Sequence, residues 1–306
     1  MSSATFTRLL NEIAANNITD NILFHIMGEP LLHPNIMDLL RYTVERTKRQ
    51  HLVTNGSLFN DVNIKECYET QLTHLSISYF TPNHALFKLR NPTNITFLDY
   101  QQTIQDVVQS KFEHNYGTHL RLFYPNINLR SFTWDGKSFE LLNKRVINTI
   151  IHTWTDFLTE LGIQPDTIRQ DAIRKWNMKK RHSVFMTDDF EIVFKPIHNW
   201  HNSNSNVIQA PIGKCSLVLN HEQLGILSNG DVVLCCGDYD GQTTFGNITT
   251  KSLTDILNSD DYHNIINRFS KGSIPFDMCK QCLGSQSISS LMWKSIGKYY
   301  ARALLT

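Results

Sequence analysis

The sequence has almost no excess of charge of either sign and no long apolar segment. Its 306 residues carry 29 Lys and Arg against 28 Asp and Glu, a formal net charge of +1. Such a balance gives no electrostatic basis for capturing nucleic acid or an anionic membrane surface. No apolar run approaches the roughly 20 residues of a membrane-spanning helix, and the N-terminal residues have no signal-peptide pattern. The sequence therefore predicts a cytoplasmic protein with neither nucleic-acid nor membrane partners.

Two further absences narrow the class of protein. The sequence has no His/Asp cluster with the spacing of a catalytic metal site, so a zinc-dependent hydrolase has no support. It also shows no internal repeat of solenoid period. Hydrophobic residues make up 41% of the chain and aromatic residues 10%. These are values of an ordinary globular protein, long enough for one large domain or two.

Cysteine is scarce, and five of the six cysteines lie between residues 215 and 282, with Cys67 as the sixth. Four of the five follow the pattern Cys215-x14-Gly230-x4-Cys235-x43-Cys279-x2-Cys282. In a cytoplasmic protein, clustered cysteines favour a metal site over disulfides. Four thiolates suit zinc and a 4Fe–4S cluster equally. Zinc ribbons usually offer two C-x2-C knuckles, and one exists here, which favours iron–sulfur.

Cysteine neighbours and isolated cysteines need a separate interpretation. Cys236 directly follows Cys235, so its side chain is expected to point away from the site. Cys67 falls in a predicted helix and is expected to be a buried or idle thiol. A hairpin predicted between strands 224–228 and 232–235 turns at Gly230 and would bring Cys235 back near Cys215.

Strands alternate with helices over the first two thirds of the chain, which predicts βα units and a parallel sheet. The predicted strands are 21–26, 51–53, 74–80, 119–124 and 191–196, and the helices between them are roughly 6–14, 34–49, 62–70 and 97–110. A helical pair is expected within an insertion near 131–180, its second helix running from 165 to about 181. The polar segment 201–206 predicts a boundary between domains 1–205 and 206–306.

Several polar residues follow the predicted strands, at the edge where α/β barrels place their sites. Glu29 lies in Gly28-Glu29-Pro30, after the first strand, and Thr54-Asn55-Gly56 follow the second. Each is also compatible with a plain turn. Ser78 is either a ligand contact or a satisfied interior serine. Arg121 projects from a strand between apolar neighbours and needs a partner, which is either a bound ligand or a structural carboxylate.

Together these motifs resemble the radical SAM superfamily, and more narrowly its members with a C-terminal SPASM or twitch auxiliary-cluster domain. The segment 6–56 looks like the early barrel of that family, and 215–282 looks like a twitch domain. Between the cysteine pairs, similar proteins also show motifs like Phe245-Gly246-Asn247-Ile248, Ser252-Leu253 and Asp255-Ile256. The resemblance implies a partial (β/α)6 TIM-like barrel, an α/β fold, followed by a small α+β domain.

The resemblance also implies ligands for particular residues. S-adenosylmethionine would be bound by Gly28, Glu29, Pro30, Thr54, Asn55, Ser78 and Arg121. An auxiliary 4Fe–4S cluster would be bound by Cys215, Cys235, Cys279 and Cys282. The family modifies substrates by radical chemistry, so an unknown peptide or small-molecule substrate and a reductant protein are the expected partners.

One departure from the family concerns its defining C-x3-C-x2-C loop, which the sequence does not contain. The family order is strand, cluster loop, helix and then the Gly-Glu-Pro strand, and this sequence starts at the helix. Two interpretations follow. In the first, a strand and a loop that carry a catalytic 4Fe–4S cluster are missing at the N-terminus. In the second, the chain is a non-catalytic binding or scaffold protein with a degenerate barrel and a structural Fe–S or Zn site.

Overall fold

The computed structural model of the chain describes residues 1–81, 83–90, 92–125, 133–134, 137–138, 144–166, 181–195, 207–285 and 287–292. The chain divides into two compact units, one made of residues 19–25 and 29–198, the other of 1–18, 26–28 and 199–306. The first helix, expected from the sequence to belong to the barrel, therefore lies in the C-terminal unit. Within the described ranges, no helix combines the length and the apolar character needed to cross a bilayer.

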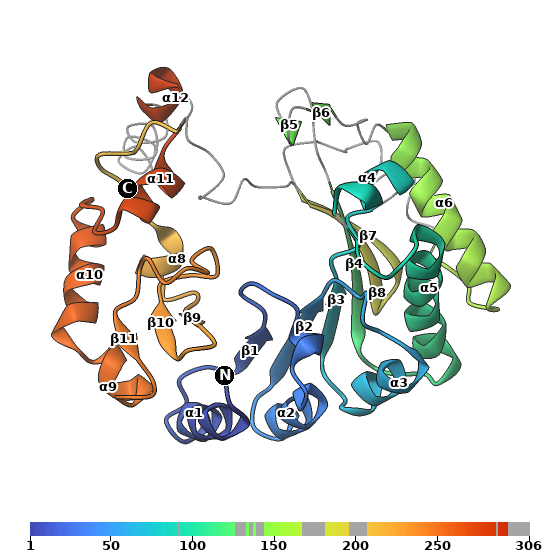
Figure 1. Cartoon of the computed structure of the whole chain (residues 1–306), viewed down its shortest axis with the longest axis horizontal. Coiled ribbons are helices and arrows are strands. Elements are labelled where there is room, and N and C mark those ends of the chain that lie inside the picture. Colours follow the sequence, from blue (N-terminus) through green and yellow to red (C-terminus); the bar gives the residue numbers. More distant parts are fainter. Residues whose placement is uncertain are drawn as a thin grey trace. The chain divides into compact units, whose positions relative to one another are not determined.

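The first unit, which we call the sheet unit, contains a six-stranded sheet of order β1-β2-β3-β4-β8-β7 (Figure 1). The first five strands in this order pair in parallel, and β7 pairs antiparallel with β8. The strands are Asn21–Phe24 (β1), Arg49–Thr54 (β2), His74–Ile77 (β3), His119–Pro125 (β4), His182–Thr187 (β7) and Phe190–Lys195 (β8). The predicted mixed α/β fold with a mainly parallel sheet is thereby confirmed.

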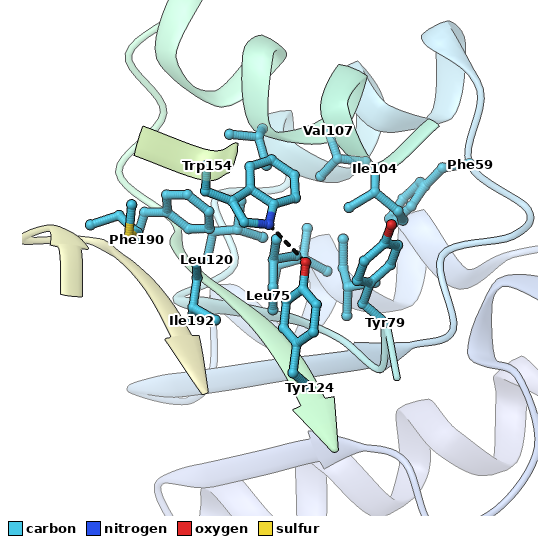
Figure 2. Packing of buried hydrophobic residues seen from close by; sticks show 14 of the residues in the cluster. Phe59, Leu75, Tyr79, Ile104, Val107, Leu120, Tyr124, Trp154, Phe190 and Ile192 are labelled. Carbon is cyan, nitrogen blue, oxygen red and sulfur yellow. Dashed lines mark hydrogen bonds between the residues drawn. The ribbon is translucent and has the colours of Figure 1, made fainter. Parts of the chain in front are cut away.

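Helices cover one face of this sheet. They are α2 (Ile36–Val44), α3 (Asp61–Glu69), α5 (Phe97–Glu113) and α6 (Lys144–Glu160), joined by the short η1 (Pro30–Leu32) and α4 (His84–Leu89). Alternate strand residues such as Leu52, Leu75, Leu120 and Ile192 are buried beneath them in one apolar cluster. Figure 2 shows the indole of Trp154 above this cluster, donating a hydrogen bond of 2.8 Å to the Tyr124 hydroxyl.

The predicted insertion is described in part. Its first helix is α6, and two short strands, Thr133–Trp134 (β5) and Lys137–Ser138 (β6), form an antiparallel ribbon before it. The second predicted helix, 165–181, lies almost entirely outside the described residues. Strand β7, which follows it, was not predicted from the sequence.

The second unit, which we call the cysteine unit, contains a three-stranded antiparallel sheet of order β11-β10-β9. The predicted hairpin is present as β9 and β10, and Gly230 adopts a φ of +92° in its turn. The strands are Gly225–Ile226 (β9), Asp231–Val233 (β10) and Gly246–Asn247 (β11). The helices are Ser3–Ala15 (α1), Ser216–Leu219 (α8), Leu253–Leu257 (α9), Asp260–Ser270 (α10), Asp277–Leu283 (α11) and Ile288–Met292 (α12).

Helix α1 is bound into the cysteine unit by two charged side chains. The Arg8 guanidinium donates to the carbonyl of Ile248. The Glu12 carboxylate accepts the backbone N–H of Thr254 at 2.7 Å and its hydroxyl at 2.9 Å, and so caps the first turn of α9. Burial alone would raise the pKa of Glu12, but these bonds and one from the Leu253 N–H bring it below its usual value.

Candidate functional site

The Glu29 carboxylate is held in a fixed position at the carboxyl end of the sheet. One oxygen, Oε1, accepts the backbone N–H of Leu31 at 3.1 Å and the Thr54 hydroxyl at 2.6 Å. The other, Oε2, accepts the backbone N–H of Asn55 at 2.7 Å. A carboxylate can accept about four hydrogen bonds, and the residues that the structure describes fill three of these positions, which leaves one on Oε2. An acceptor fixed in this way is suited to an ammonium group.

The turn Thr54-Asn55-Gly56 supports this carboxylate with its backbone and its hydroxyl. The Thr54 side chain is buried, and its oxygen also accepts the Gly56 N–H at 3.0 Å. The Asn55 side chain accepts the N–H of Ser57 at 2.7 Å, so it stabilises its own turn. Gly56 has a φ of +77°, and a Cβ there would lie 2.7 Å from Ile104 Cδ1. The turn thus needs glycine, and its predicted ligand contacts remain predictions.

Gly28 and Pro30 shape the backbone on either side of Glu29. Gly28 has a φ of +94°, in the region that favours glycine, and a Cβ there would meet no atom within 4 Å. Pro30 starts the helix η1, for which Glu29 is the N-cap. Both residues therefore act on Glu29 through the backbone.

Ser78 and Arg90 lie beside the same turn. The Ser78 N–H donates to the Thr54 carbonyl at 2.8 Å, and the Ser78 carbonyl accepts Nη1 of Arg90 at 3.1 Å. The Tyr100 hydroxyl connects the turn to Arg90, since it donates to the Asn55 carbonyl at 2.5 Å and lies 3.4 Å from Arg90 Nη1. The exposed guanidinium of Arg90 therefore lies near Glu29's supporting turn. Sequence reasoning missed Arg90, whose one signal is a basic residue after a short helix.

Arg121 has a structural partner, as one of the two sequence interpretations proposed. Arg121 on β4 and Glu191 on β8 are direct neighbours in the sheet, and Arg121 Nε donates to Glu191 Oε1. Nε2 of His119 lies 3.3 Å from the same oxygen. Burial would raise the pKa of Glu191, but the neighbouring polar groups of His119 and Ser183, with the hydrogen bond and the charge of Arg121, lower it to about 2.

Three histidines form a row across the sheet, on the face opposite to the one that the helices cover. His51, His74 and His119 are successive neighbours on β2, β3 and β4, with ring centroids 5.6 Å and 5.5 Å apart. The His51 Nε2 lies 2.6 Å from the Ser76 hydroxyl. Burial, followed by the positive charge of Arg121, lowers the pKa of His51 to about 3. The same two causes lower the pKa of His74. Sequence reasoning did not identify this row.

The partly buried imidazole of His51 predicts a loss of stability in mild acid. The folded protein keeps His51 neutral down to about pH 3, whereas the unfolded chain takes up a proton near pH 6.5. Stability should therefore fall as the pH drops below about 6.5, by about 2 kcal/mol at pH 5. His74, His25, Arg121 and Arg181 are the neighbours that oppose the extra charge.

Urea unfolding at pH 7.5 and pH 5 tests this. The variant His51→Gln should lose about 2 kcal/mol less than the wild type between the two pH values. His263→Gln, which changes an exposed histidine, serves as the control and should behave like the wild type. An equal loss in wild type and His51→Gln would contradict the prediction.

The four predicted cysteine ligands lie together in the cysteine unit. Cys215 precedes α8, Cys235 follows β10, and Cys279 and Cys282 lie three apart on α11. Burial, together with the neighbouring thiols of Cys235, Cys282 and Cys215, raises the pKa of Cys279 to about 12. Burial also raises the pKa of Cys235. The structure therefore brings the thiols of Cys215, Cys235 and Cys282 within electrostatic range of Cys279.

This donor set fits an iron–sulfur cluster. Cys215 and Cys279 pack against an apolar cluster that includes Leu234 and Phe269, which limits solvent around the thiols. Cys236 is exposed, and its sulfur accepts a long bond of 3.7 Å from Gln223. In the described part of the chain, no three His, Cys, Asp or Glu side chains converge tightly enough for one metal ion.

Cys67 is fully buried in the sheet unit.

Comparison with known proteins gives one family match and several similar folds. Residues 215–283 match the SPASM family, an iron–sulfur cluster-binding domain. SuiB from Streptococcus suis, bound to S-adenosylmethionine, superposes with a TM-score of 0.50 at 15% identity, over 87% of this chain and 61% of SuiB. BtrN in complex with AdoMet and 2-DOIA gives 0.46 at 14%, over 89% and 75%. A search by sequence found no match among curated proteins.

These findings differ in reach. The family match identifies the cysteine unit over 69 residues and confirms the predicted iron–sulfur domain type. At 15% identity the likeness to SuiB concerns the fold, and the chain spans 61% of SuiB's length. The narrower assignment to a twitch domain stays a prediction.

Proposed function

We propose that the chain is a radical SAM-type protein with a SPASM iron–sulfur domain, as the domain match and the similar fold support, and that it binds two groups. Cys215, Cys235, Cys279 and Cys282 hold an auxiliary 4Fe–4S cluster. The sheet unit binds S-adenosylmethionine at Glu29. The proposed substrate is a peptide or a small metabolite, and a reductant protein is the proposed electron source.

The observation that carries the proposal is the preorganised carboxylate of Glu29. The methionyl end of S-adenosylmethionine carries one ammonium and one carboxylate. The free position on Glu29 Oε2 accepts the ammonium. Three existing hydrogen bonds already hold the carboxylate in the orientation that this contact needs. The Arg90 guanidinium, linked to the same turn through Tyr100, is a cation of the type that binds carboxylates.

The chemistry of the family needs one more component. When bound, S-adenosylmethionine and a catalytic 4Fe–4S cluster supply a radical that abstracts hydrogen from the substrate. Three clustered thiolates of a C-x3-C-x2-C motif would hold that cluster, and the 306 residues contain no such motif. In our proposal, residues outside this sequence supply it. The chain's own residues bind and orient the cofactor, and the four-thiolate site leaves no open iron, which favours electron transfer by the auxiliary cluster.

The missing motif favours one alternative function. Without the three thiolates, the chain would act as an iron–sulfur protein that binds S-adenosylmethionine without cleaving it. The coding sequence directly upstream of Met1 separates the two functions. An in-frame C-x3-C-x2-C motif there supports the radical enzyme, and a stop codon directly before Met1 supports the non-catalytic protein.

Calorimetric titration with S-adenosylmethionine tests the Glu29 site. Glu29→Gln should weaken binding about tenfold or more, because a hydrogen bond to a charged group contributes about 1.5–3 kcal/mol. Glu69→Gln makes the same chemical change at an exposed position on α3 and should bind as the wild type does. Equal affinity in Glu29→Gln and wild type would remove Glu29 from the site.

The same proteins report on the missing motif. With dithionite as reductant, the 306-residue chain should form no 5′-deoxyadenosine, since it lacks thiolates for a catalytic cluster. Formation well above the Glu29→Gln level would mean that other residues hold such a cluster.

A further inference from the structure

Asp238, three residues after Cys235, is an almost completely buried carboxylate with 1% of its surface exposed. No cation in the described part of the cysteine unit forms an ion pair with it. Its charge is instead met by three donors. Oδ1 accepts the Gln242 N–H at 3.0 Å, and Oδ2 accepts both the N–H and the hydroxyl of Thr243 at 2.6 Å. A buried charge without a counterion is costly, so its position requires a reason.

These bonds close the loop 235–243 on itself. At its start, the Asp238 N–H donates to the Cys235 carbonyl at 3.1 Å. At its end, the Thr243 hydroxyl that donates to Asp238 also accepts the N–H of Leu234 at 3.1 Å. The carboxylate thus connects the end of the loop to the residue before Cys235. Substitution of either Asp238 or Thr243 would release this connection.

The closed loop fixes the backbone on both sides of Cys235. The Leu234 N–H before it is held by the Thr243 hydroxyl, and the Cys235 carbonyl is held by the Asp238 N–H. The Asp238 carboxylate is also close enough to Cys279 to act on it electrostatically. The position of the ligands and the charge around an iron–sulfur cluster both affect its reduction potential.

We propose that Asp238 is a positioning residue for the iron–sulfur cluster. By holding the 235–243 loop closed, it fixes the backbone of Cys235 and with it the position of the sulfur that would bind iron. A thiolate held in place keeps the cluster bound, so the closed loop slows the release of iron and helps to set the reduction potential. The inference rests on the proposed cluster site and adds to it the residues that position one of its ligands.

Two substitutions distinguish the effect of loop closure from the effect of the carboxylate charge, and two more serve as controls. Thr243→Val removes the hydroxyl that joins Asp238 to Leu234 and keeps the carboxylate charge. Asp238→Asn removes the charge and places an amide N–H against the donors of Gln242 or Thr243. Thr243→Ser keeps the hydroxyl and should restore wild-type behaviour. Asp240→Asn changes an exposed aspartate of the same loop and serves as the matched control.

The experiment uses the full chain, reconstituted anaerobically with iron and sulfide. A redox titration followed by electron paramagnetic resonance measures the potential, and bleaching with a chelator measures iron release. We expect a changed potential in Thr243→Val and Asp238→Asn, and release of iron about tenfold faster in both. Thr243→Ser and Asp240→Asn should match the wild type in both. Melting of the metal-free variants by circular dichroism verifies that they fold.

The outcomes distinguish this inference from the function on which it rests. If the wild type takes up no iron, the cluster site itself fails, and the inference fails with it. If the wild type loads iron and both variants keep its potential and its release rate, the inference alone is overturned. A lower melting temperature with an unchanged potential also overturns it, because that result describes a residue that merely stabilises the fold.

Discussion

Replacing Cys279 by serine should remove most of the iron that the reconstituted protein binds. The wild type should hold about four irons per chain with a broad visible absorbance, as expected for one 4Fe–4S cluster. Helix α11 places Cys279 and Cys282 one turn apart, and the thiols of Cys235, Cys282 and Cys215 all act electrostatically on Cys279. A serine hydroxyl is a poor substitute for a thiolate at iron, so the variant lacks one of the four protein ligands around which this site is built.

Cys236, which is adjacent to the predicted ligand Cys235, provides the control. Cys236→Ser changes an exposed sulfur next to the ligand Cys235 and should leave the iron content unchanged. Iron and acid-labile sulfide per chain, measured after gel filtration, give the result. Wild-type iron in Cys279→Ser would show that the ligand set is wrong. Stoichiometric zinc with no uptake of iron by the wild type would favour the zinc alternative.

Substituting Glu191 by alanine should destabilise the sheet unit by about 3–5 kcal/mol, the usual cost of breaking a buried ion pair. The Glu191 side chain is 4% exposed and that of Arg121 is 22% exposed. Without Glu191, the Arg121 guanidinium stays inside the sheet face with no carboxylate to pair with. Equilibrium urea unfolding at pH 7.5, where the Glu191 carboxylate is ionised, measures the change.

A double variant isolates the unpaired charge as the cause. Arg121→Met combined with Glu191→Leu removes both charges and should recover most of the lost stability, because apolar pairs often replace buried ion pairs without loss. Asp38→Ala breaks an exposed ion pair in which the side chain of Asp38 is 77% exposed and that of Arg41 is 42% exposed. This substitution should cost less than about 1 kcal/mol. A cost as small for Glu191→Ala would refute the prediction.

The sequence predicted the parallel strands because each has an apolar run between clear turns. It did not predict β7, since the hairpin between β7 and β8 turns on Asp188 and Asp189 without the glycine that usually marks such a turn. It also placed α1 in the barrel. The contacts that bind α1 to the cysteine unit pass through Arg8 and Glu12, whose partners lie about 240 residues away, and no local pattern contains that information.

The residues of the site could be predicted where their spacing along the sequence is itself typical of a function. Four cysteines at cluster spacing and a glutamate after a strand could be found by reading along the chain. Arg90 and Asp238 could not, because their roles arise from contacts. Arg90 reaches the turn at Asn55 through Tyr100, and Asp238 acts through hydrogen bonds of its own loop. A single arginine or aspartate in a polar segment is a common solvated residue.

The link between α1 and the cysteine unit has a consequence for synthesis in the cell. Arg8 and Glu12 are 240 and 242 residues from their partners Ile248 and Thr254. At about 5–20 residues per second, a ribosome needs roughly 12–50 s to add that length of chain. For that time the apolar residues of α1, Leu9, Leu10 and Ile13, wait on a growing chain without the unit they complete. The cysteine unit can therefore form only late in translation, because α1 is bound to residues near position 250.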